Sequence, residues 1–391
     1  MFELVDSIPK NAEIKVVGVG GGGGNAVRHM MASNIDGVHF ICANTDAQSL
    51  NDLENATILQ LGGTLTKGLG AGANPEVGRQ AALEDKERIA QVLEGADMVF
   101  ITAGMGGGTG TGGAPVIAEV AKQMGILTVG VVTRPFSFEG RKRMAIADAG
   151  IAALKERVDS LIIVPNEKLM QVLGKEMTVI NAFKQANDVL FGAVQGITDL
   201  IMLDGLINVD FADVRTVMAE MGMAMMGTGE ASGTDRAKVA AEGAIKCPLL
   251  EDINLQGAKG ILVNITSGYD LTLGEFEDVG DTIRSFADED ATIIVGSVFE
   301  PELEDQLRVT VVATGLRGVA AKTGPRGVVV DNAPARRTAS GDIDYGRLDK
   351  PTINRRSTTA ADGSTARKMD INADPEMDYL DVPAFLRKQA D

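Results

Sequence analysis

Three glycine-rich segments carry the residues best suited to chemistry in this chain. They are residues 20–25 (GGGGGN), 104–113 (GMGGGTGTGG) and 67–74 (KGLGAGAN). Glycines let a backbone approach a ligand closely, and unpaired N–H groups at a helix start attract anions. Thr109 and Thr111 add two hydroxyls to the second segment. Together the three segments predict a site for the phosphates of a nucleotide.

Each segment is expected to lie where a helix begins. Apolar runs predict strands at residues 14–19 and 98–103, directly before the first two segments, and helices at residues 25–33 and from Pro115, which suits a first helical turn. In the third segment Asn74 is the expected N-cap, with Pro75 following it. Because parallel strands end at one edge of a sheet, the three helix starts should converge on one anionic ligand there. Three turns without a ligand are the alternative.

The wider pattern predicts an α/β protein. Strands are expected at residues 14–19, 38–43, 98–103, 127–133 and 161–164, and helices at 25–33, 75–93 and 115–124, which gives a Rossmann-like parallel sheet covered on both faces. A helix over residues 179–203 is apolar on nearly every side, so it should be buried. Helices at 236–246 and 276–287 with strands at 260–265, 292–299 and 307–314 predict a smaller mixed α/β domain.

The expected domain organisation has six parts. A flexible N-terminus (1–11) precedes a nucleotide-binding domain (12–178), the central helix (179–203) and a C-terminal α/β domain (204–316). Residues 317–376 are poor in large apolar residues, so they should form a disordered linker. Residues 377–391 gather Tyr379, Leu380, Val382, Phe385 and Leu386, which predicts a peptide that orders on a partner; a merely sticky end is the alternative.

Composition excludes several classes of protein. The net charge of −17 argues against generic binding to nucleic acid, and a total of two histidines argues against a histidine-based metal site. Cys42 and Cys247 lack metal-ligand spacing, and Cys42 lies in an apolar run, so a reduced buried thiol is expected there. No leader and no apolar run approaching about 18 residues are present, which predicts a soluble intracellular protein.

Two kinds of nucleotide protein fit the first glycine segment. Gly18, Gly20 and Gly23 match the dinucleotide fingerprint, with Asp46 as a possible ribose ligand, so an oxidoreductase is the competing hypothesis. A dinucleotide domain needs one such loop, whereas two facing loops suit a longer polyphosphate. The chain has neither the G-x-x-x-x-G-K-[ST] motif of P-loop enzymes nor an N-K-x-D guanine motif. The identity of the base does not follow from composition or spacing.

Residues 106–112 (GGGTGTG) match the tubulin signature. Together with residues 20–25, 208–213 (NVDFAD) and 378–387, they make the chain resemble the tubulin/FtsZ family over residues 12–316 and the last fifteen residues. The resemblance implies a GTP-hydrolysing protein that polymerises head-to-tail and forms the cytokinetic ring on the cytoplasmic side of the membrane at mid-cell. It also implies GTP/GDP and Mg²⁺ as ligands. Through residues 378–387 the tail would bind FtsA-like and ZipA-like anchoring proteins and a Min-type inhibitor, without membrane insertion or nucleic-acid binding.

The resemblance also implies roles for individual residues. The implied phosphate cradle consists of Gly21, Gly22, Gly23, Gly24, Asn25, Gly108, Thr109 and Gly110. Ala71 and Ala73 match the loop that senses the γ-phosphate. The implied flank of the ribose and phosphates consists of Thr133, Glu139 and Arg143. The implied guanine pocket consists of Asn166, Phe183 and Asn187. Phe183 and Asn187 are four apart on one helix face, so one could stack and the other hydrogen-bond; core packing is the alternative for Phe183. Gly113 and Asp204 depart from the family pattern without touching an assigned residue.

Asp210 and Asp213 form the best candidate catalytic pair. They are three apart at the start of a helix expected near Phe211, and by residue type alone they would cap and stabilise that helix. The resemblance implies instead that residues 205–213, with Asn208, Asp210 and Asp213, complete the nucleotide site of the next subunit. These carboxylates would position the attacking water, and Mg²⁺ would shield the phosphates. A filament protein without turnover is a third hypothesis.

Overall fold

The computed structural model describes residues 12–316, except for residues 34, 36, 52, 54, 175, 204, 206, 208, 221, 251–257 and 304. The expected N-terminal segment (1–11), linker (317–376) and C-terminal peptide (377–391) lie outside the described residues, as do Asp204 and Asn208.

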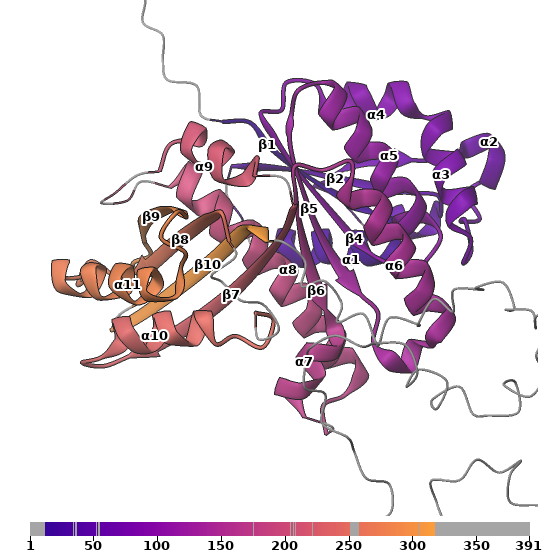
Figure 1. Cartoon of the computed structure of the whole chain (residues 1–391). Coiled ribbons are helices and arrows are strands. Elements are labelled where there is room, and N and C mark those ends of the chain that lie inside the picture. The colour runs from indigo at the N-terminus through magenta and orange to yellow at the C-terminus, as the bar shows by residue number, and fades with distance from the viewer. Residues whose placement is uncertain are drawn as a thin grey trace, which may run out of the picture. The chain divides into compact units, whose positions relative to one another are not determined.

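The described strands form a single mixed sheet of ten (Figure 1). In chain order they are β1 (Ile14–Val19), β2 (Val38–Asn44), β3 (Thr57–Gln60), β4 (Met98–Gly104), β5 (Leu127–Arg134), β6 (Ser160–Pro165), β7 (Gly222–Ser232), β8 (Gly260–Ser267), β9 (Thr292–Phe299) and β10 (Gln306–Leu316). Their order across the sheet is β3-β2-β1-β4-β5-β6-β7-β10-β8-β9. The first six strands and β7 run parallel, and β10 runs antiparallel between β7 and β8. The predicted α/β architecture is confirmed.

Helices cover both faces of this sheet (Figure 1). They are α1 (Gly20–Ala32), α2 (Gly63–Thr66), α3 (Pro75–Glu84), α4 (Lys86–Leu93), α5 (Thr109–Gln123), α6 (Arg141–Lys155), α7 (Asn166–Leu173), α8 (Val179–Met202), α9 (Phe211–Met218), α10 (Arg236–Ile245) and α11 (Leu273–Phe286), with 3-10 turns η1 (Gln48–Leu50) and η2 (Ser137–Glu139). None of the helices in the described part of the chain combines the length and apolar character needed to cross a membrane.

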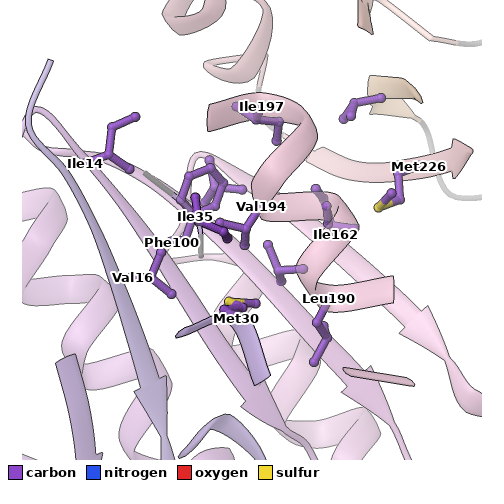
Figure 2. Packing of buried hydrophobic residues seen from close by; sticks show 14 of the residues in the cluster. Ile14, Val16, Met30, Ile35, Phe100, Ile162, Leu190, Val194, Ile197 and Met226 are labelled. Atoms are coloured by element: carbon purple, nitrogen blue, oxygen red, sulfur yellow. The ribbon is translucent and has the colours of Figure 1, made fainter. Parts of the chain in front are cut away.

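Successive side chains of each strand point to opposite faces of the sheet, so the hydrophobic core is divided between these two faces. Val16 of β1 and Phe100 of β4 join the cluster on the face of α1 and α8, while their neighbours Val17 and Ile101 join the cluster under α3 to α6. In Figure 2 Leu190 and Val194 of α8 lie in the same cluster as Phe100 and the Met30 side chain of α1. The carboxyl ends of the parallel strands are thereby held in a fixed row.

Two helices begin earlier than the sequence predicted. Helix α1 starts at Gly20 rather than at residue 25, and α5 starts at Thr109, which leaves Pro115 inside the helix and not in its first turn. Glycine costs about 1 kcal/mol in a helix relative to alanine, so local propensity opposes both starts. Packing decides otherwise, because a side chain at Gly23 would run into the carbonyl of Thr102 and one at Gly112 into that of Pro75.

Three further differences have local reasons. The helix expected over residues 75–93 is broken at Asp85, whose carboxylate accepts the Gly62 N–H at 2.7 Å. Strand β7 was missed because its glycines disfavour a strand, yet side chains at Gly227 and Gly229 would collide with α10. The prediction that the central helix is buried is wrong for residues 179–184, of which only Ala182 is buried and Ile180 is 81% exposed, whereas every residue from Gln185 to Met202 is buried or half-buried.

Candidate functional site

The three glycine segments pack directly against one another. A Cβ atom at Gly108 would lie 3.0 Å from Cβ of Ala71 and would collide with the carbonyl of Gly72. A Cβ atom at Gly20 would lie 2.8 Å from the nitrogen of Gly110. The first and third segments therefore both touch the second, and they do so at the carboxyl ends of β1 and β4. The convergence expected from the sequence is present, and only glycine permits it.

Helices α1 and α5 present N-termini suited to an anion. No described side chain caps the start of either helix, and neither first turn contains an acidic residue. Their leading N–H groups and positive dipole ends are therefore available to a phosphate. Helix α3 differs, because the Asn74 side chain accepts the Glu76 N–H at 3.1 Å. The predicted N-cap is confirmed, so this segment offers its loop backbone and not an uncapped helix start.

The cradle residues on α1 divide into packed and open positions. Gly23 is buried, and a Cβ atom at Gly22 would lie 3.0 Å from Cα of Gly104. Apart from the chain neighbours and the backbone of α1 itself, no described atom comes within 4 Å of a Cβ built on Gly21 or Gly24. Asn25 is exposed, and its side-chain oxygen accepts from Arg28 at 2.8 Å. Open space thus begins at the first turn of α1, beside a cavity of about 180 Å³.

The loop that carries Ala71 and Ala73 follows a path that glycines make possible. Gly68, Gly70 and Gly72 all have positive φ, which L residues rarely adopt. Ala71 is buried against Gly108, whereas Ala73 is exposed. A loop tip that touches the cradle and faces outward could contact a terminal phosphate.

Thr133, Glu139 and Arg143 lie beside the second glycine segment. The Thr133 carbonyl accepts the Met105 N–H at 3.0 Å. Arg143 pairs with Glu139 at 3.2 Å, and its Cγ atom would lie 2.8 Å from a Cβ atom at Gly106. Glu139 also accepts the Phe136 N–H at 3.0 Å. All three predicted flank residues are therefore brought to the cradle.

An aromatic and amide surface continues from this flank. Phe136 is buried and meets Phe183 of α8 edge-on, with ring centroids 5.2 Å apart. Phe183 is 41% exposed, so the core-packing alternative for it is wrong. Asn187 lies one turn further along α8, and Asn166 starts α7. The Asn166 side-chain oxygen is buried without a hydrogen-bond partner among the described residues, so it could accept a hydrogen bond from a ligand.

The acidic pair lies at the opposite end of the sheet. Asp210 caps α9 by accepting the Asp213 N–H at 2.8 Å, and both residues are exposed. Arg215 on the same helix donates to the carbonyl of Gly125, just before β5 begins. The glycine loops lie past the carboxyl ends of the strands, and the eight residues of β5 span about 26 Å. Asp210 and Asp213 therefore cannot reach the cradle of their own chain.

Sequence reasoning missed one residue of the site. Thr45, directly after β2, is buried, and its hydroxyl lies 2.6 Å from the hydroxyl of Thr109. The polar run Asn44-Thr45-Asp46 at the end of an apolar strand was the available signal. The Asp46 carboxylate accepts from Gln48 and Ser49, so it is engaged in its own turn.

The nearby thiol has the predicted state. Cys42 on β2 is buried and free, and burial raises the pKa of its thiol to about 11. Cys247 is also free. Neither cysteine supplies a nucleophile to the site.

Comparisons with known proteins assign the family. Residues 13–174 match the GTPase domain of the Tubulin/FtsZ family, and residues 222–317 match the C-terminal domain of the FtsZ family. The cell division protein FtsZ of Pseudomonas aeruginosa is 63% identical over the whole of both chains, and that of Azotobacter vinelandii is 61% identical. This similarity decides against the dinucleotide oxidoreductase.

Solved structures agree with the sequence relatives. An empty FtsZ dimer from M. jannaschii superposes with a TM-score of 0.74 at 46% identity, covering 78% of this chain and 88% of that one. A point mutant of the same protein gives 0.75, with 92% of its chain covered. The chain belongs to the tubulin/FtsZ family: it is a cell-division protein of the FtsZ type, a tubulin-like GTPase that forms filaments.

Proposed function

We propose that each GTP is held by the glycine loops of one subunit and hydrolysed with the help of Asn208, Asp210 and Asp213 of the next subunit. The observation that carries this proposal is the placement of the two half-sites. The cradle and the acidic pair lie at opposite ends of the same sheet, so head-to-tail stacking brings them together. Contacts of this kind that do not close into a ring generate filaments.

The chemistry assigned to each half-site follows from its groups. The uncapped starts of α1 and α5 would hold phosphate oxygens, and Arg143 adds a cation at their flank. The exposed Asp213 carboxylate, which forms no hydrogen bond or ion pair with another described residue, could order a water in line with the terminal phosphate. Mg²⁺, held mainly by the phosphates themselves, would offset the charge between triphosphate and carboxylates.

Assembly-dependent turnover tests this proposal. The specific GTPase activity of the full chain should be near zero in dilute solution and rise sharply above a threshold protein concentration, because only interfaces contain complete sites. Phosphate release measured alongside light scattering would show the two thresholds coinciding. Constant specific activity from dilute protein upward would mean that each subunit holds a complete site.

Guanine selectivity is proposed to rest on Asn166 and Asn187, with Phe183 as the stacking surface. A buried amide that pairs with one base is left unpaired by another, so it discriminates between them. Asn187→Leu should weaken GTP binding about tenfold, the effect of losing roughly 1.4 kcal/mol, and should narrow the preference over ATP. Titrations with both nucleotides would measure this. Unchanged GTP affinity in that variant would remove Asn187 from the pocket.

Residues 378–387 are proposed to dock on FtsA-like and ZipA-like membrane anchors and on a Min-type inhibitor, which would place the filaments in a ring at mid-cell. Apolar side chains close to the end of a polar tether motivate this. Deletion of residues 377–391 should leave GTP hydrolysis near the full-length value and abolish capture of an immobilised anchor protein. A deletion that destroyed hydrolysis would instead make the tail part of the catalytic body.

A further inference from the structure

We infer that Thr45 is a positioning residue that aims the hydroxyl proton of Thr109 at the bound phosphate and ties the 67–74 loop to the cradle. Thr45 lies outside the glycine segments, and its role rests on the proposed placement of phosphate at the start of α5.

The hydroxyl groups of Thr45 and Thr109 are buried and hydrogen-bond to each other. The two oxygens are 2.6 Å apart, Thr45 is fully buried, and Thr109 is 9% exposed. Neither hydroxyl has a further hydrogen-bond partner in the described part of the chain. Each hydroxyl has one proton, so the pair can point either way when nothing else engages it.

A bound phosphate would set the direction of the hydrogen bond between Thr45 and Thr109. Phosphate oxygens only accept hydrogen bonds, so Thr109 at the first position of α5 must turn its proton toward the ligand. Thr45 must then donate to Thr109. Successive hydrogen bonds that run in one direction polarise one another, which strengthens the bond to the phosphate.

The backbone of Thr45 connects the hydroxyl pair to the third glycine segment, residues 67–74. Its carbonyl accepts the Gly70 N–H at 3.1 Å and the Thr66 hydroxyl at 3.2 Å. Further along this loop, Gly72 and Ala71 pack on Gly108, next to Thr109. The loop is therefore attached to the cradle at two places, and the hydroxyl pair closes the connection between them.

A double-mutant cycle tests the inference. We would measure the affinities of Thr45→Val, Thr109→Val and the double variant for GDP and for GTPγS, with protein diluted below the assembly threshold. Thr45→Val keeps the shape of the side chain and removes the hydroxyl. It should raise both Kd values about tenfold, near the upper end of the range for losing a hydrogen bond between neutral groups. The same substitution in the Thr109→Val background should have no further effect.

Two variants separate positioning from general damage. Thr45→Ser restores the donor and should return affinity close to that of the unmodified chain. Thr128→Val removes an equally buried hydroxyl, which donates to the Ile126 carbonyl at the far end of β5, and should leave both Kd values unchanged.

The outcomes distinguish this inference from the proposed function. Additive effects of Thr45→Val and Thr109→Val, or failure of Thr45→Ser to restore binding, would overturn the role of Thr45 while leaving the cradle in place. If Thr109→Val alone left both affinities unchanged, the placement of phosphate at α5 would itself be wrong.

Discussion

Asp213→Ala should lower GTP turnover by about 100-fold or more while GTP binding and filament formation persist. The expected size is that of losing a group that positions the nucleophile or moves its proton. The side chain is exposed, and its backbone N–H stays capped by Asp210, so the helix should tolerate the change. The matched control is Asp281→Ala, which removes an exposed aspartate carboxylate on a different helix, α11, and should keep full activity. Phosphate release and filament pelleting measure the two properties separately.

Mixing this variant with a cradle variant gives the sharper result. Gly108→Ser keeps the acidic pair but drives a side chain into the Gly72 carbonyl, so it should bind GTP poorly. In a random equimolar filament about one interface in four pairs an intact cradle with an intact acidic loop, so turnover should recover toward about a quarter of the unmodified value. Recovery requires that the Gly108→Ser subunits still dock. Full inactivity of mixtures that do co-pellet would contradict a shared site.

Gly21→Asp should severely weaken nucleotide binding without destabilising the nucleotide-free protein. Apart from the chain neighbours and the backbone of α1 itself, no described atom lies within 4 Å of the new Cβ. A carboxylate in the first turn of a helix stabilises that helix by about 0.3–1 kcal/mol. The same carboxylate would face the phosphates. One pair of like charges 4 Å apart costs about 4 kcal/mol near a protein surface, which corresponds to roughly a thousandfold weaker binding.

Gly274→Asp is a closely matched control for this substitution. Gly274 is the second residue of α11, as Gly21 is of α1, and it too has open space at its Cβ position. Thermal unfolding without nucleotide should show an equal or raised Tm for both variants. GTP titration should show weakened binding for Gly21→Asp and unchanged binding for Gly274→Asp. Undiminished GTP affinity in folded Gly21→Asp would remove the start of α1 from the phosphate site.

The sequence alone determined much of this protein because many of its signals are local. Apolar runs identified most strands to within a residue or two, and Asn74 and Asp210 were identifiable as helix caps from type and position. The glycine segments indicated a polyphosphate site, and the tubulin signature at residues 106–112 led to the family. The separate contributions of the two half-sites came from the resemblance and not from residue types.

Tertiary structure decided what depends on neighbours distant in sequence. Local propensity opposes helix starts at Gly20 and Thr109 and a strand at β7, but at each place another backbone approaches too closely for any side chain. The pairing of Thr45 with Thr109 joins residues 64 positions apart, so no local pattern announces it. The distance between the acidic pair and the cradle is likewise a property of the folded sheet. It arises because α9 packs at the amino ends of strands whose carboxyl ends hold the glycine loops.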